Sequence, residues 1–151
     1  MTKHEELKEG IKTAMKARDE IRLSVLRGIV TACTNELVAK GRKPDEMLND
    51  EDVVTIISRL AKQRKDSIEQ FRKGGRQDLV DKEAAELKIL ETLLPPQMAR
   101  EDIEKAVRAK MTELGVSDKT GAGKLIGALM KDLRGKADGS EVKAIVDSLL
   151  Q

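Results

Sequence analysis

The chain of 151 residues contains one His, one Cys, one Phe, and no Trp or Tyr. With 37% charged and 39% hydrophobic residues, it lies near the polar limit of sequences that fold, and its length predicts one domain or two small ones. The scarcity of aromatic residues argues against β-sandwiches and against RNA-binding sheets, which stack bases on aromatic rings. Its abundant Leu, Lys, Glu, Ala, Ile and Arg are typical of helices.

The cysteine and histidine content limits both the compartment and the chemistry. Cys33 is the only cysteine, so no intramolecular disulfide can form, and one histidine is too few for a zinc-ligand set. No apolar run approaches the roughly 18 residues of a membrane helix, and residues 1–10 lack the apolar segment of a signal peptide. These observations predict a cytoplasmic protein with no membrane association, no metal and no cofactor.

The formal net charge is only +2, but the charged residues are arranged in blocks of one sign. Residues 44–52 are acidic, residues 59–76 are strongly basic, and residues 77–91 are acidic again. A basic block of this density can contact phosphates, whereas charge runs more often form a solvated face. The neighbouring acidic blocks could also neutralise it in the folded protein.

Apolar residues at spacings of three and four predict helices along most of the chain. The first helix covers about 7–15 and is interrupted near Arg18. The second runs through about 21–37, and Gly41 stands where a helix-capping glycine is expected.

The third and fourth predicted helices are separated by a glycine pair. Asn49 or Asp50 can cap the third helix, and Gly74-Gly75 ends it. The fourth helix covers about 77–94. Together with the first two, these helices predict a four-helix N-terminal unit.

Pro95-Pro96 cannot continue a helix, so we place a boundary there between an N-terminal domain, 1–96, and a C-terminal domain, 97–151. Three further helices are predicted at about 100–114, 120–133 and 140–150, the last capped by Ser140. No segment shows strand-like alternation. The predicted fold class is all-α, a four-helix unit followed by a small three-helix tail domain.

Three charged residues fall on apolar helix faces. On a helical wheel, Arg64 lies near the centre of the apolar face of the third helix, and Arg22 and Glu36 lie among the apolar residues of the second. Because an isolated buried charge is costly, we predict a structural ion pair of Glu36 with Arg64, Arg22 or both. Its loss in Glu36→Ala would cost about 3–5 kcal/mol. A ligand-binding cleft is the alternative.

The chain has no recognisable catalytic set. His4 lies in a terminus that is expected to fray, and Cys33 lies on an apolar helix face where its thiol should be inert. The run TGAGKL at 120–125 resembles a phosphate loop, but Asp118 and Leu125 replace the Gly and the Ser or Thr of a Walker motif. Tight helix packing is the preferred interpretation of its glycines, with anion binding at the helix start as the alternative.

Several runs resemble the YqeY family (GatB/YqeY domain). They are 22–27 (RLSVLR), Asn35-Glu36, 62–71 (KQRKDSIEQF), 75–80 (GRQDLV), 90–95, 127–130 and 135–139. The resemblance extends from about residue 3 to residue 150, and KQRKDSIEQF is its most specific run. Gly28 within the second helix is the one departure.

This family is similar to the C-terminal portion of the B subunit of tRNA-dependent amidotransferase, and a related module is fused to some glutaminyl-tRNA synthetases. There it is a helical domain followed by a small tail domain, which helps to hold tRNA. The resemblance therefore implies a bacterial accessory protein that associates with tRNA or with a tRNA-processing enzyme, with no catalytic centre of its own.

The resemblance and the charge pattern together identify candidate tRNA contacts. On the third helix they form what we call the basic face, consisting of Arg59, Lys62, Lys65, Arg72 and Lys73. In the tail they are Lys124, Lys131, Arg134 and Lys136, beside a 135–139 turn that could approach a phosphate. Without aromatic residues to stack on bases, these groups would recognise RNA shape and backbone. Phe71, the one aromatic residue, is assigned to the core.

The sequence is also compatible with two other function classes. The charge blocks could dock a protein partner such as an aminoacyl-tRNA synthetase or an amidotransferase. The family association also suggests participation in carbon–nitrogen ligation with glutamine as amido-N-donor, although the sequence shows neither a nucleophile nor an ATP site.

Overall fold

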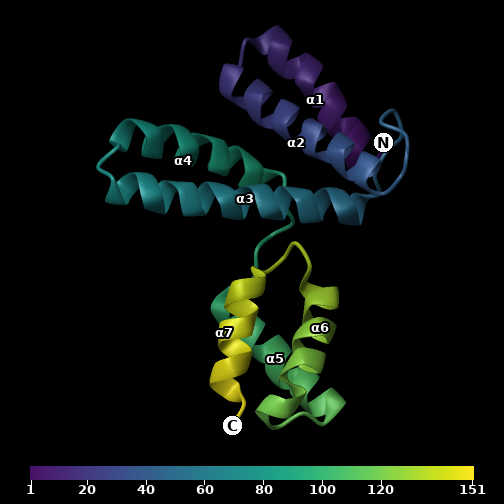
Figure 1. Ribbon diagram of the computed structural model, residues 1–151, viewed down its shortest axis with the longest axis vertical. Coiled ribbons are helices and arrows are strands. Elements are labelled where there is room, and N and C mark those ends of the chain that lie inside the picture. Colours follow the sequence, from purple (N-terminus) through teal and green to yellow (C-terminus); the bar gives the residue numbers. More distant parts are fainter. The chain divides into compact units, whose positions relative to one another are not determined.

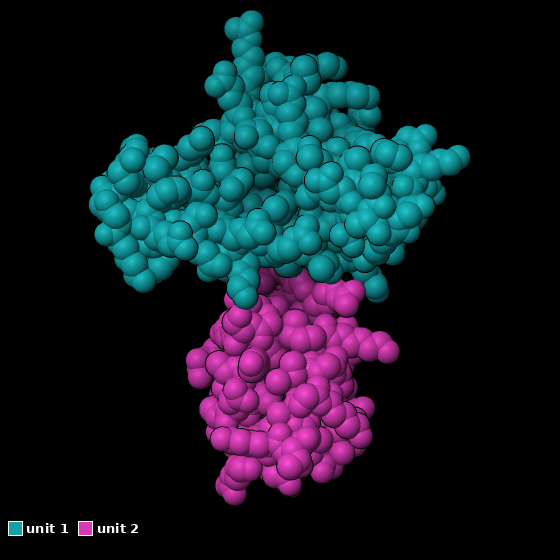
Figure 2. All heavy atoms as spheres, in the orientation of Figure 1, with its two compact units in different colours: residues 1–94 teal, residues 95–151 magenta.

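The structure is a computed structural model that describes residues 1–151. It is all-helical, as predicted, with seven α-helices, one short 3₁₀ helix and no strands (Figure 1). The chain divides into two compact units, residues 1–94 and 95–151 (Figure 2). None of the helices combines the length and the apolar character needed to cross a membrane.

The first two helices begin and end at local capping signals. In α1 (Lys3–Ala17), the Thr2 hydroxyl accepts from the Glu5 N–H while the Glu5 carboxylate accepts from the Thr2 N–H, which is a capping box. Arg18 ends α1 in the left-handed conformation, with φ 56°. Asp19 then caps α2 (Glu20–Ala39) by accepting from the Arg22 N–H. The predicted interruption near Arg18 is confirmed.

Glycines end α2 and α3 (Asp50–Lys73) in the same way. Gly41 and Gly75 adopt φ 72° and 71°, a region that glycine enters without steric cost. After each glycine, the next N–H bonds back to a helix carbonyl, Arg42 to Leu37 and Arg76 to Phe71. These bonds satisfy carbonyls at the helix C-terminus, as in a Schellman motif.

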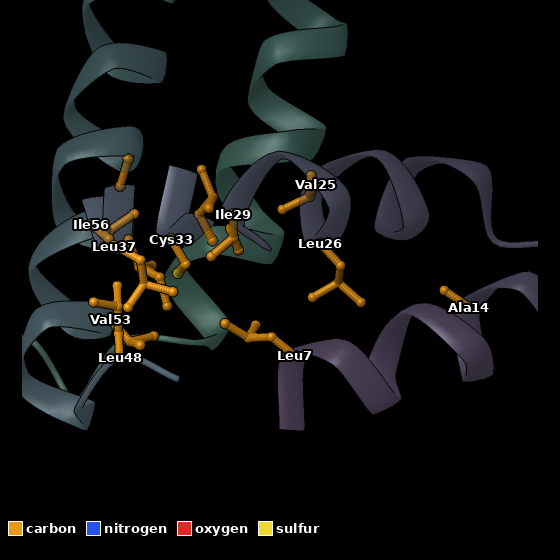
Figure 3. Close-up of a cluster of buried hydrophobic side chains, with 13 residues drawn as sticks. Leu7, Ala14, Val25, Leu26, Ile29, Cys33, Leu37, Leu48, Val53 and Ile56 are labelled. Atoms are coloured by element: carbon orange, nitrogen blue, oxygen red, sulfur yellow. The ribbon is translucent and has the colours of Figure 1, made fainter. Parts of the chain in front are cut away.

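The helices α3 and α4 (Gln77–Thr92) run side by side as a hairpin (Figure 1). Its inner half belongs to the core of residues 1–94, where α1, α2, α3 and the end of α4 share one cluster of buried side chains (Figure 3). That cluster consists of Leu7, Ala14, Val25, Leu26, Ile29, Cys33, Leu37, Leu48, Val53, Ile56, Ile57, Ala61 and Leu90. The outer half of the hairpin, residues 62–86, contributes no buried member to it.

Phe71 lies in this outer half and is only half-buried. Its assignment to the core is therefore wrong, because after Ala61 the helix α3 has left the shared cluster of buried side chains. An amphipathic pattern identifies the face of a helix that packs, but it does not show how many neighbours that face will have.

Residues 95–151 form a second cluster of buried side chains. Its elements are α5 (Arg100–Leu114), η1 (Lys119–Gly121), α6 (Ala122–Leu133) and α7 (Gly139–Leu149). Its buried members are Ile103, Val107, Leu125, Leu129, Leu133, Val142, Ile145, Val146 and Leu150. The Met98 N–H donates to the Lys136 carbonyl at 2.8 Å, so the start of this unit is attached to the turn between α6 and α7.

Two local predictions for this unit need correction. Asp138, rather than Ser140, caps α7, because its carboxylate accepts from the Ser140 N–H at 3.0 Å. Close packing explains Gly121, where an added Cβ would lie 2.6 Å from a Val116 methyl carbon. It does not explain Gly123 or Gly127, where an added Cβ would meet no atom within 4 Å.

Candidate nucleic-acid interface

The basic face of α3 is exposed to solvent. Its five members, Arg59, Lys62, Lys65, Arg72 and Lys73, are all exposed. Arg59, Lys62 and Lys73 lie opposite the apolar stripe of α3, whereas Lys65 and Arg72 lie at its flank. The five extend over fourteen helical steps, or about 21 Å at 1.5 Å per residue. Lys73 lies 3.8 Å from Glu69 in an exposed pair within the helix, whereas Arg59, Lys65 and Arg72 form no ion pair. The face therefore remains cationic.

Acidic residues of the block 77–91 pair with arginines that lie outside the basic face. On α4, Glu83 and Glu86 lie 3.4 and 3.1 Å from the guanidinium of Arg64. Asp78 lies 3.1 Å from Arg76, and that hydrogen-bonded guanidinium lowers the pKa of the Asp78 carboxyl. Three carboxylates of the second acidic block are thus engaged by these two arginines.

The predicted ion pair among Arg22, Glu36 and Arg64 is wrong. Arg64 contacts α4 instead, and Glu36 has only Lys40 nearby, at 3.9 Å. The wheel placed Arg64 correctly on the packed face of α3, but it could not show which helix packs there. The i, i+3 spacing of Glu83 and Glu86 was the signal that could have identified the partner, because it places both carboxylates on one face of α4.

The cluster of Arg64, Glu83 and Glu86 has short distances between its charged groups but few aligned hydrogen bonds. Glu86 is 7% exposed, while the Arg64 side chain keeps 37% of its surface in solvent. The Arg64 Nε and the Glu83 Oε2 have no aligned hydrogen-bond partner. The cluster is therefore held mainly by charge attraction between α3 and α4.

The C-terminal unit carries the second set of predicted cations. Lys124, Lys131, Arg134 and Lys136 are all exposed, and the first two lie two turns apart on α6. In the adjoining turn, Gly135 is buried with φ 77°, and its carbonyl accepts from the Gln97 side-chain amide at 2.7 Å. This glycine thus holds the start of the unit in place, and phosphate contact by the turn stays a prediction.

His4 and Cys33 are both buried. The expectation that His4 lies in a fraying terminus is wrong, because its Nδ1 accepts from the Leu48 N–H at 3.0 Å and attaches α1 to the segment before α3. Burial lowers the pKa of His4, and the charge of Lys8 lowers it further. Burial also raises the pKa of the Cys33 thiol to about 11, so the reactive thiolate is scarce at neutral pH.

Comparison with known proteins places the chain in a family. The family model for Yqey-like proteins matches residues 4–150, which is nearly the whole sequence. The chain belongs to the YqeY family. The resemblance expected from the sequence runs is therefore confirmed.

Several curated relatives of this YqeY chain come from fungi. The protein named "Altered inheritance of mitochondria protein 41, mitochondrial" is 37% identical over 115 residues in Kluyveromyces lactis, covering 74% of this chain and 60% of the relative. The protein of that name in Lachancea thermotolerans is 38% identical, covering 74% and 59%. The Saccharomyces cerevisiae protein is 33% identical over 135 residues, covering 87% and 68%. The YqeY chain thus spans about 60% of the first two relatives.

These relatives contradict the expectation of a bacterial, cytoplasmic protein, because they are fungal and their names place them in mitochondria. The physical observations behind that expectation could not separate the two compartments. A lone reduced cysteine and the lack of an apolar span are compatible with any reducing, aqueous compartment.

Proposed function

We propose that this YqeY-family protein binds tRNA through the basic face of α3, without catalysing a reaction on it. The observation that carries the proposal is the row of exposed cations along about 21 Å of one helix, with Glu83, Glu86 and Asp78 paired to other arginines. Cations arranged in this way can neutralise several phosphates and release their counterions. The family resemblance to tRNA-holding modules supports tRNA as the nucleic acid.

The mode of recognition would be backbone contact. Aromatic stacking platforms are missing, since Phe71 is the one aromatic residue and is half-buried. Double-helical RNA can instead be recognised through its phosphates and overall shape. Lys124, Lys131, Arg134 and Lys136 would supply further phosphate contacts from the C-terminal unit.

We further propose that the chain forms two domains, a four-helix domain of residues 1–96 and a three-helix tail domain of residues 97–151. The compact units 1–94 and 95–151, each with its own cluster of buried side chains, support this division. In this arrangement the two sets of cations are carried by different domains, which can contact different parts of one RNA.

The test is a gel shift of the full chain with deacylated tRNA across a salt series. Binding should weaken steeply as salt rises, because counterion release drives it. The charge-reversal variant Lys62→Glu, Lys65→Glu, Lys73→Glu should bind much more weakly, and neutral glutamines at the same positions should reduce the salt slope by about 1 per residue.

The matched control reverses three exposed lysines outside the basic face, Lys12, Lys16 and Lys43. It changes the net charge by the same amount but at other positions. It should weaken binding far less, because the proposal requires the positive charges to lie on the basic face. Equal loss in both variants would indicate non-specific attraction. Binding that is absent at low salt, or unchanged by reversal of the basic face, would refute the proposal.

A further inference from the structure

Three helices of residues 1–94 and the segment after α4 line a cavity of about 200 Å³ that is partly open to solvent. Its apolar wall comes from α1, α2, α3 and the segment after α4, through Leu7, Leu26, Ile57 and Leu93. Leu7 and Leu26 project from α1 and α2 toward the same interior space (Figure 3). Lys3, Glu6 and Arg22 also line the cavity, so charged groups adjoin an apolar wall.

Arg22 is the residue that sets the chemistry of this cavity. Its side chain is half-buried and forms no ion pair, although the sequence had predicted one with Glu36. A partly desolvated guanidinium without a counter-charge is unfavourable, and a carboxylate is the group it binds best, through two parallel hydrogen bonds. Lys3 adds a second cation to the same lining.

Glu6 makes the cavity bipolar. Lys3 and Glu6 are three residues apart on α1, so cation and carboxylate lie on one side of that helix together with Leu7. Glu6 is exposed and therefore solvated in the free protein, so a ligand with only a negative charge would gain no attractive contact from it. A zwitterion with an apolar side chain would match all three features of the lining.

Gly10 contributes an unusual residue choice at the same place. It lies inside α1 and lines the cavity, although glycine in a helix interior costs about 1 kcal/mol relative to alanine. An added Cβ would lie 3.1 Å from the Leu26 Cδ1, so a side chain here would crowd the leucine that forms the wall. The glycine therefore preserves the space between α1 and α2.

We propose that this cavity binds a free α-amino acid with a branched apolar side chain, such as leucine. Its carboxylate would pair with Arg22 and Lys3, its ammonium group with Glu6, and its isobutyl group would contact Leu26 and Ile57. The volume is suitable, because a buried apolar cavity of about 150 Å³ accommodates benzene. This site does not depend on tRNA binding, since its residues are not members of the basic face.

The experiment is an NMR titration of the full-length protein, following the methyl signals of Leu26 and Ile57. Leucine should shift them with a Kd of about 1 mM, as expected for a ligand of this size. Leucinol, which lacks the carboxylate, and 4-methylpentanoate, which lacks the ammonium group, should each bind more weakly. Arg22→Gln should raise the leucine Kd about tenfold.

The control is Arg27→Gln, an exposed arginine on the same helix that does not line the cavity. It should leave the leucine Kd unchanged, and far-UV circular dichroism should show both variants folded. Should Arg22→Gln fail to fold, the comparison of leucine with leucinol on the unmodified protein decides the question. No shift at about 20 mM leucine, or equal shifts with leucinol, would overturn the proposal.

Discussion

In the inner half of the α3–α4 hairpin, Val53, Ile57 and Leu90 are buried in a cluster shared with α1 and α2. In the outer half, residues 62–86, Val80 is the one buried apolar side chain, Phe71 is only half-buried, and Arg64 lies within ion-pair distance of Glu83 and Glu86. The inner half thus relies on burial of apolar surface, whereas the outer half combines a thin apolar seam with paired charges.

This difference explains where the candidate interface lies. A helix packed on several sides has little surface left for a ligand, while one packed along a single stripe exposes most of its circumference. Four of the five basic-face residues belong to the outer half. Their exposure follows from the limited packing there. The ion pairs of Arg64 help to hold α3 against α4 along that single stripe.

The largest expected effect is in the inner half. Leu90→Ala removes a side chain that is 2% exposed and should lower the free energy of unfolding by about 3 kcal/mol, because it leaves a cavity among well-packed neighbours. Leu79→Ala, at a half-buried position of the outer half, should cost only about 1 kcal/mol. Native-state hydrogen exchange of the α3 and α4 amides would measure both. Equal losses would contradict the contrast between the halves.

The next effect concerns the charges. Glu86→Gln should cost about 1 kcal/mol, since it removes the buried partner of Arg64, whose own guanidinium can still reach solvent and Glu83. Glu36→Gln should change stability by less than about 0.5 kcal/mol, because its contact with Lys40 is long and exposed. Urea denaturation would compare them. A larger loss of stability in Glu36→Gln than in Glu86→Gln would support the ion pair of Glu36 that was predicted from the sequence.

Acidification should weaken the attachment of α1 to the segment before α3. Protonation of His4 would break its acceptance from the Leu48 N–H, and its pKa in the folded state lies below the ordinary value of 6.5. The unfolded chain therefore takes up the proton first, so stability is full above about pH 6.5 and falls below it, by at most about 1.4 kcal/mol per pH unit.

Amide exchange in α1 at about pH 7 and about pH 5, corrected for intrinsic rates, would measure this loss. The control is His4→Gln, whose side-chain carbonyl can accept from Leu48 but does not titrate. Its stability should lack the component that the wild-type protein loses between these pH values. An identical pH dependence in both proteins would exclude His4 as its source.

The smallest effect is expected at the single aromatic residue. Phe71→Leu should cost about 0.5 kcal/mol, because the ring is only half-buried and leucine retains much of its apolar surface. It should leave tRNA affinity unchanged if recognition does not involve stacking. Denaturation and gel shift on the same variant would test both points, and a marked loss of RNA binding would place Phe71 in the interface.

Much of the helical framework was predictable because its signals are local. Arg18-Asp19, Asn49 and Gly74-Gly75 act through their own backbone and the adjacent turn, so helix ends were located to within a few residues. The exposure of the basic face was also predictable, since long cationic side chains opposite an apolar stripe remain in solvent. The cap of α7 was misplaced by two residues because aspartate and serine are both good caps.

The errors concern partners in space. Arg64 pairs with α4 and not α2, Phe71 lies beyond the shared core, and His4 is buried and bonded to Leu48 although it is the fourth residue of the sequence. Helical periodicity determines which face of a helix turns inward, and caps determine where it ends, because both act within a few residues. Which helix meets that face, and whether a charged side chain finds a partner or lines a cavity, was decided only by tertiary packing, which joins residues far apart in the chain.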